Sequence, residues 1–110
     1  MSHITPAELE LWQRSGFAFE LLDVRRDMAR TKDGSEIAGS HWQDPALWLD
    51  WKDAVAHDKP VVVYCAHGHE IGQGLCAALR AMGADARYLQ GGMTAWKEAG
   101  LATIPHREGS

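Results

Sequence analysis

The chain has 110 residues, of which 45% are hydrophobic and 24% charged, a composition typical of one globular domain and not of a disordered chain. Its net charge of -4, without a run of like charges, argues against nucleic-acid binding. No apolar stretch approaches the roughly 18 residues that span a bilayer, residues 1–9 lack signal-peptide features, and two cysteines are too few for a disulfide scaffold. We therefore expect a cytoplasmic domain over residues 1–105 with a frayed tail at 106–110, and neither a nucleic-acid nor a membrane partner.

A capping box predicts the first helix. Thr5 supplies an N-cap hydroxyl, Pro6 suits the first helical position, and Glu8 stands three residues after the cap. Ser and Gly at positions 15–16 end this helix. The apolar run that follows predicts a buried strand over residues 17–24.

The middle of the chain is less regular. Residues 26–40 are rich in charge and contain two glycines, so we expect a connection anchored by Ile37. Asp44 and Pro45 then form a cap and a first-turn proline, which predicts an amphipathic helix to about residue 56. Its core-facing side is formed by apolar residues at spacings of one, three and four, namely Leu47, Trp48, Trp51 and Val55.

The remaining elements alternate clearly. A β-branched run predicts a central strand over 61–64, followed by a helix over 71–82, a strand over 86–89 and a helix over 93–99. Strands that alternate with helices favour right-handed crossovers and a parallel sheet. We therefore predict an α/β fold with a central, mostly parallel sheet and helices on both faces.

Cys65 is the leading candidate for a reactive residue. It stands one residue after the strand predicted over 61–64, and ligands of open α/β sheets bind beyond the carboxyl ends of their strands. The loop that follows contains Gly68 and leads into a helix, so its backbone N–H groups can line an anion site that stabilises a thiolate. We predict that Cys65 is a nucleophile. Cys76, inside the predicted helix over 71–82, is expected to pack in the core.

The chain resembles the rhodanese family of sulfurtransferases along nearly its whole length. The matching segments are Leu-Leu-Asp-Val-Arg at 21–25, Ile-Ala-Gly-Ser at 37–40, Val-Val-Tyr-Cys at 62–65 followed by Gly68, and Tyr-Leu-Gln-Gly-Gly at 88–92 followed by Trp96 and Gly100. They occur in the family's order and at suitable spacing. This resemblance implies a single rhodanese-like domain.

The resemblance also implies a reaction. A cysteine takes a sulfane sulfur from a donor, holds it as a persulfide and passes it to a thiol or cyanide acceptor, which is a small molecule or a protein. Cys65 would carry the sulfur, and no cofactor or metal is needed. The substrate-binding residues would be Arg25, which matches a family arginine but stands where structural ion pairs are common, and the loop residues Ala66, His67, Gly68, His69, Glu70 and Ile71, whose N–H groups would hold the sulfur anion.

The loop departs from the family pattern after Gly68. Rhodanese-like loops often carry a basic residue at the fifth position and Ser or Thr at the next two, but this chain has His69, Glu70 and Ile71 there. Two hydroxyl donors are therefore missing, and a carboxylate near the site repels a dianion such as thiosulfate. This makes a persulfide an alternative to thiosulfate as the natural donor.

Three other functions fit parts of the sequence. Cys65, His67 and His69 could ligate zinc or copper in a metal-binding sensor. A non-catalytic rhodanese-like module would bind a protein partner, although such modules commonly lack the cysteine. A related phosphatase would need an arginine six residues after the cysteine, where this chain has Ile71.

Overall fold

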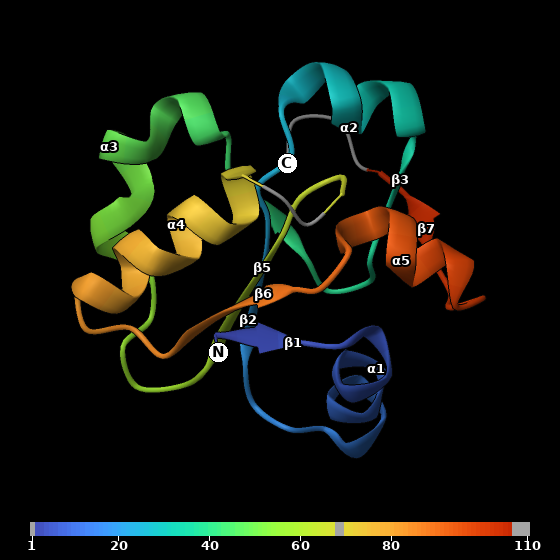
Figure 1. The fold of residues 1–110 in the computed structure, drawn as a ribbon, viewed down its shortest axis with the longest axis horizontal. Helices are drawn as coiled ribbons and strands as arrows, with labels where there is room; N and C mark the ends of the chain where they lie inside the picture. Colours follow the sequence, from blue (N-terminus) through green and yellow to red (C-terminus); the bar gives the residue numbers. More distant parts are fainter. Residues whose placement is uncertain (1, 68–69, 107–110) are drawn as a thin grey trace.

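The computed structural model describes residues 2–67 and 70–106, except for the side chain of Glu70. Within these residues, five strands form one sheet in which all neighbouring strands run parallel (Figure 1). Their order across the sheet is β1 (His3–Ile4), β6 (Ala86–Leu89), β5 (Val61–Tyr64), β2 (Glu20–Asp23) and β4 (His41–Trp42). A short antiparallel pair, β3 (Ser35–Glu36) and β7 (Ile104–Pro105), lies apart from it. The predicted α/β fold is confirmed.

Helices cover both faces of the sheet (Figure 1). One face packs against α1 (Pro6–Ser15) and α5 (Gly92–Glu98), and the other packs against α3 (Trp48–Trp51) and α4 (Glu70–Ala81). A further helix, α2 (Asp27–Asp33), follows β2. No helix among the described residues is long and apolar enough to cross a membrane.

The central strand β5 divides the core into two layers. Val61 and Val63 pack on the side of α3 and α4, whereas Val62 and Tyr64 pack on the side of α1 and α5. All four side chains are fully buried, as expected for a strand of a parallel sheet covered on both faces. The alternation continues into Cys65, which therefore belongs to the layer under α4.

The predicted first helix is confirmed in detail, but the strand after it is shorter than expected. The Thr5 side chain accepts a hydrogen bond from the Glu8 backbone, and the Glu8 side chain accepts one from the Thr5 backbone. The strand predicted over 17–24 is present only as β2 (Glu20–Asp23). Phe17 instead packs on the end of α1: its N–H donates to the Trp12 carbonyl, and the centres of the two rings lie 4.6 Å apart with their planes tilted by 43°.

The middle of the chain differs more from the prediction. Residues 26–40 are not only a connection, because they contain α2 and β3. The helix predicted after Pro45 breaks into α3 and the flanking 3-10 turns Pro45–Leu47 and Lys52–Ala54. Trp51 faces the core as predicted, but Leu47 is 52% exposed because the break turns it outward.

Candidate active site

Cys65 lies at the carboxyl end of the central strand, as predicted. Its side chain is only 6% exposed, and it packs with the layer under α4. The first turn of α4 comes close to the sulfur: a β-carbon added at Gly72 would lie 3.3 Å from the Cys65 Sγ. The glycine therefore leaves space beside the sulfur, and the positive end of a 12-residue helix lies close to it.

The first turn of α5 holds the start of the loop after Cys65. The Met93 N–H donates to the Cys65 carbonyl at 2.9 Å, and the Thr94 N–H donates to the Ala66 carbonyl at 3.0 Å. Gly91, at the N-cap of α5, has a φ of 75°, and a β-carbon there would lie 2.4 Å from that of Ala95. A glycine is therefore required for this tight turn, which brings α5 onto the loop.

A cavity of about 540 Å³ opens over Cys65. Its walls come from the end of β2, from α2, from the loop and from α4, and its lining residues are Arg25, Arg26, Ala29, Cys65, Ala66, His67 and Ile71. The structure thus brings together five of the predicted site residues, namely Cys65, Ala66, His67, Ile71 and Arg25. The predictions for Gly68 and His69 lie outside the described residues, as does the side chain of Glu70.

A second cavity of about 490 Å³ adjoins the first. The two share Arg25, Ala29, Ala66 and His67. The further lining residues of the second cavity are Lys32 and Asp33 of α2 and Met93, Thr94 and Lys97 of α5. Lys32, Lys97 and His67 are exposed, so this space presents mostly basic side chains to solvent.

Arg25 lines both cavities, but its guanidinium group is held by the protein. It donates to both carboxylate oxygens of Asp23, at 2.9 and 2.7 Å, to Asp33 at 2.8 Å and to the Ser35 carbonyl at 2.8 Å. Burial acts to lower the pKa of Arg25, but the hydrogen bond and charge of Asp23 outweigh it and raise the pKa above its usual value. The guanidinium is therefore a fixed positive charge, anchored in the wall of the site.

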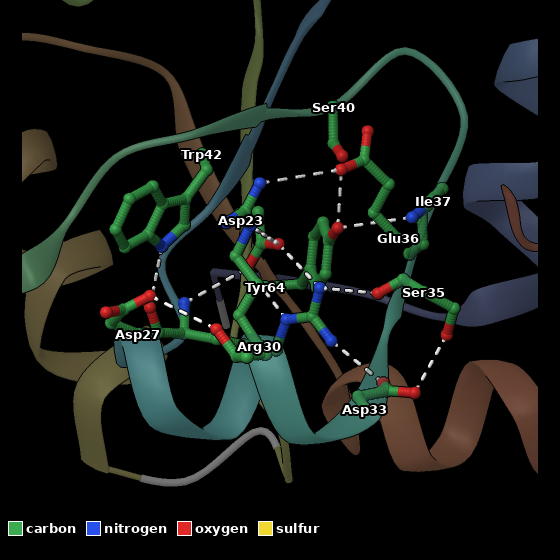
Figure 2. A network of polar contacts seen from close by, with 12 residues as sticks. Asp23, Asp27, Arg30, Asp33, Ser35, Glu36, Ile37, Ser40, Trp42 and Tyr64 are labelled. Carbon is green, nitrogen blue, oxygen red and sulfur yellow. Dashed lines mark hydrogen bonds and ion pairs between the residues drawn. The ribbon is translucent and has the colours of Figure 1, made fainter. Parts of the chain in front are cut away.

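A buried polar network surrounds this ion pair (Figure 2). Arg30 lies 4.0 Å from Asp23 and 3.9 Å from Glu36, with its guanidinium 4.6 Å from the centre of the Trp42 ring. The Tyr64 hydroxyl donates to the Ser40 Oγ at 3.1 Å and accepts from the Ile37 N–H at 3.2 Å. Buried charges are stable only when they are paired, so the residues of this network must keep their positions. The network thereby holds the segment between β2 and β4 in place, next to β5, the strand that leads to Cys65.

Sequence reasoning missed several residues that build the site. No sequence motif includes Gly72, Thr94 or Lys97, and the residues of α2 were expected to form a connection without a helix. Thr94 could have been found only by folding the last helix against the loop. One signal was available in the sequence: the double glycine at positions 91–92, where α5 begins, which permits that close approach.

The second cysteine is in the core, as predicted. Cys76 is 1% exposed, packs with Leu79 and Val63, and its Sγ lies 3.5 Å from the Ser2 carbonyl. Burial raises the pKa of this thiol, and Arg80 offsets only part of the effect. The metal-binding alternative of Cys65, His67 and His69 includes a residue outside the described part of the chain; within that part, no three His, Cys, Asp or Glu side chains gather into a metal site.

Comparison with known proteins gives relatives of the same architecture. The chain is 33% identical over 102 residues to a probable adenylyltransferase/sulfurtransferase MoeZ from Mycobacterium tuberculosis; the match covers 86% of this chain and 24% of the relative, so the chain spans about a quarter of its length. A rhodanese-like domain protein from Staphylococcus aureus superposes with a TM-score of 0.78 at 25% identity, covering 87% of this chain and 91% of that one.

A larger enzyme shares the fold. Thiosulfate sulfurtransferase from Pseudomonas aeruginosa superposes with a TM-score of 0.78 at 24% identity, over 97% of this chain and 20% of that one. The family model of the rhodanese-like domain matches residues 5–99. That span includes the sheet from β2 to β6 and all the cavity-lining residues named above, and the chain therefore belongs to the rhodanese-like domain family.

Proposed function

We propose that this protein is a sulfurtransferase that carries a sulfane sulfur on Cys65. The observation that carries the proposal is the position of the Cys65 sulfur: it lies at the end of the central strand, lines an open cavity and is approached by the first turn of α4. A helix N-terminus favours negative charge, so this position suits both a thiolate and a persulfide anion. The similarity to a probable adenylyltransferase/sulfurtransferase supports the same conclusion.

The reaction proceeds in two transfers. In the first, the Cys65 thiolate attacks the outer sulfur of the donor, the donor's S–S bond breaks, and its remaining part leaves with the electron pair; with thiosulfate the leaving group is sulfite. In the second, a thiol or cyanide acceptor takes the outer sulfur and Cys65 leaves as the thiolate. Neither step as written requires a metal or an organic cofactor. The acceptor is a small molecule or a second protein.

Intact mass spectrometry after incubation with a sulfur donor tests this proposal. The wild type, treated in parallel with thiosulfate, with glutathione persulfide or with buffer, should gain one reducible sulfur atom with at least one donor. Cys65→Ser should gain none, and Cys76→Ala, the matched control in the core, should load like the wild type.

Two outcomes would contradict the proposal. A wild type that gains no sulfur from either donor would point to the non-catalytic binding module instead. Sulfur found on Cys76, in a folded Cys65→Ser variant, would show that the wrong cysteine has been assigned.

A further inference from the structure

We propose that His67 is a catalytic residue that takes the proton from an incoming thiol acceptor through its Nε2 atom, and that Thr94 is the positioning residue that fixes this role. The inference rests on the proposed sulfur transfer and adds to it a specific group for the second step. Three features carry it: a hydrogen-bond chain, the lining of both cavities by His67, and the charges that line the second cavity.

The hydrogen-bond chain determines which imidazole nitrogen carries the proton. The Thr94 Oγ1 lies 3.0 Å from the Ala66 carbonyl oxygen and 2.9 Å from the His67 Nδ1. A carbonyl oxygen can only accept, so the single hydroxyl hydrogen of Thr94 must point to Ala66. The Nδ1 atom must then donate to the Thr94 oxygen, which places the lone pair of neutral His67 on Nε2.

The same chain also suits the protonated imidazole. When Nε2 takes up a proton, both ring nitrogens become donors, and the Nδ1 donation to Thr94 is unchanged. No hydrogen bond of the chain has to break during the proton transfer. Thr94 is itself held in place, because its backbone N–H donates to the same Ala66 carbonyl.

His67 lines both cavities, the one that contains Cys65 and the one that is bounded by α2 and α5. An acceptor thiol that occupies either cavity therefore comes close to the imidazole. A general base must lie within reach of the proton that it takes, and the lining of both cavities by His67 suits that role.

The charged groups that line the second cavity act on an acceptor that enters there. Arg25, Lys32 and Lys97 bring positive charge, and Asp33 brings negative charge. Arg25 and Lys97 are both paired with Asp33, and Arg25 also with Asp23, so much of their charge is neutralised. Positive charge in this lining favours the thiolate that the acceptor becomes when it loses its proton.

The step balances in atoms and charge. The acceptor R–SH gives its proton to Nε2, and the resulting thiolate attacks the outer sulfur of the persulfide anion Cys65–S–S⁻. The bond between the two persulfide sulfurs breaks, and its electron pair remains on the Cys65 Sγ. The products are R–S–S⁻, the Cys65 thiolate and the protonated imidazole, and no external oxidant or reductant is involved.

A single-turnover comparison of two acceptors tests the inference. The protein is first loaded with one sulfur and then mixed at pH 8 with 2-mercaptoethanol, which must lose a proton, or with sulfite, whose attacking lone pair carries none. His67→Gln should slow discharge to 2-mercaptoethanol by about 100-fold, the usual contribution of a general base, and change discharge to sulfite by less than about threefold. Imidazole added to His67→Ala should restore part of the thiol reaction.

Variants of Thr94 separate tautomer control from packing. Thr94→Val removes the hydroxyl but keeps the backbone contact to Ala66, and it should slow only the thiol reaction; Thr94→Ser keeps the hydroxyl and should behave like the wild type. Equal slowing of both acceptors in His67→Gln, or the absence of imidazole rescue, would overturn the inference while sulfur loading still supported the proposed function. A wild type that never loads sulfur would overturn both.

Discussion

The two cysteines of the chain have different surroundings, and we expect them to differ in reactivity for that reason. Cys65 and Cys76 are both buried and belong to the same apolar layer, but Cys65 lines the first cavity, whereas Cys76 of α4 packs inside the core. Desolvation raises the pKa of the Cys76 thiol and suppresses its nucleophilic form. The two thiols are therefore similar in the fraction that is buried, and they differ in whether the sulfur faces a cavity and lies near the N-terminus of a helix.

The substitution Gly72→Ala tests how much space the sulfur of Cys65 needs. In Gly72→Ala the new methyl group would lie 3.3 Å from the Sγ, where a persulfide must fit one more sulfur atom. We expect sulfur loading, measured by mass against time, to slow by at least about threefold, because crowding in a packed site is costly. Unfolding in urea should show that the protein remains folded.

Gly74→Ala is the matched control in the same helix. A β-carbon at Gly74 meets nothing within 4 Å, so this variant gains helix propensity alone, worth about 0.5–1 kcal/mol, and should load sulfur at the wild-type rate. If Gly72→Ala loaded as fast as Gly74→Ala, the space beside the sulfur would not limit the reaction.

At the scale of elements, one carboxylate joins α2 to α5. Asp33 accepts hydrogen bonds from Arg25 Nη1 and from the Ser35 Oγ, both at 2.8 Å, and from the Lys97 ammonium group. Arg25 lies two residues after β2, and Lys97 belongs to α5, whose first turn holds the loop after Cys65. The cavity walls are therefore tied together through a single side chain.

This tie should make stability depend on pH. Burial raises the pKa of Asp33, but the hydrogen bonds from Lys97 and Ser35 and the charges of Lys97 and Arg25 together lower it below its usual value. A group whose folded-state pKa is lowered stabilises fully above its unfolded pKa of about 4, and this contribution is lost as the pH falls through the lower folded value. Asp33→Asn should thus cost about 1–3 kcal/mol at pH 7 and progressively less below pH 4.

Urea unfolding from pH 7 to pH 3 measures this difference. The exposed Asp50 of α3 offers a matched control, since Asp50→Asn changes the same net charge and should change the free energy of unfolding by less than about 0.5 kcal/mol. A difference between wild type and Asp33→Asn that stayed constant across the range would contradict an ionic role for this carboxylate.

Elements with a strong local signal could be predicted from the sequence, and the others depend on contacts between distant segments. The capping box of α1 and the β-branched run of β5 act locally, and both were correctly predicted. The one side chain that α2 buries is Arg30, so its sequence shows no hydrophobic periodicity. β1 and β4 have two residues each and exist because they pair with β6 and β2.

The part of the candidate site that is built from residues close in sequence could be predicted, and the part that is built from contacts between distant segments could not. The position of Cys65 and its loop could be predicted from the strand that precedes them and the helix that follows them. The Arg25–Asp33–Lys97 connection joins three separate segments, and the Thr94–His67 contact spans 27 positions. Such contacts are set by how α2 and α5 close around the sheet, which no local pattern encodes.

At the scale of the whole molecule, the charge around the site opposes the net charge. The chain carries -4 overall, yet the described residues that line the two cavities include Arg25, Arg26, Lys32 and Lys97 and one carboxylate, that of Asp33, with Arg25 also paired to Asp23. A cleft lined mainly by one sign of charge concentrates ligands of the other sign. We therefore expect an anionic sulfur donor to be attracted to the mouth of the site although the molecule as a whole repels it.

Reversing one charge at the mouth tests this attraction. Lys32 is exposed and lines the second cavity, so Lys32→Glu should raise the KM for thiosulfate by about threefold or more at low ionic strength, with little change in kcat, because it acts on approach of the donor. In 1 M salt, where the Debye length falls to about 3 Å, the effect should nearly vanish.

Lys59 provides the control for the same change in net charge. It is exposed and precedes β5, at the opposite end of the strand from Cys65. Steady-state kinetics of Lys59→Glu should therefore match the wild type at every salt concentration. A KM raised equally by both substitutions would assign the effect to net charge, and the local basic lining would then have no part in steering the donor.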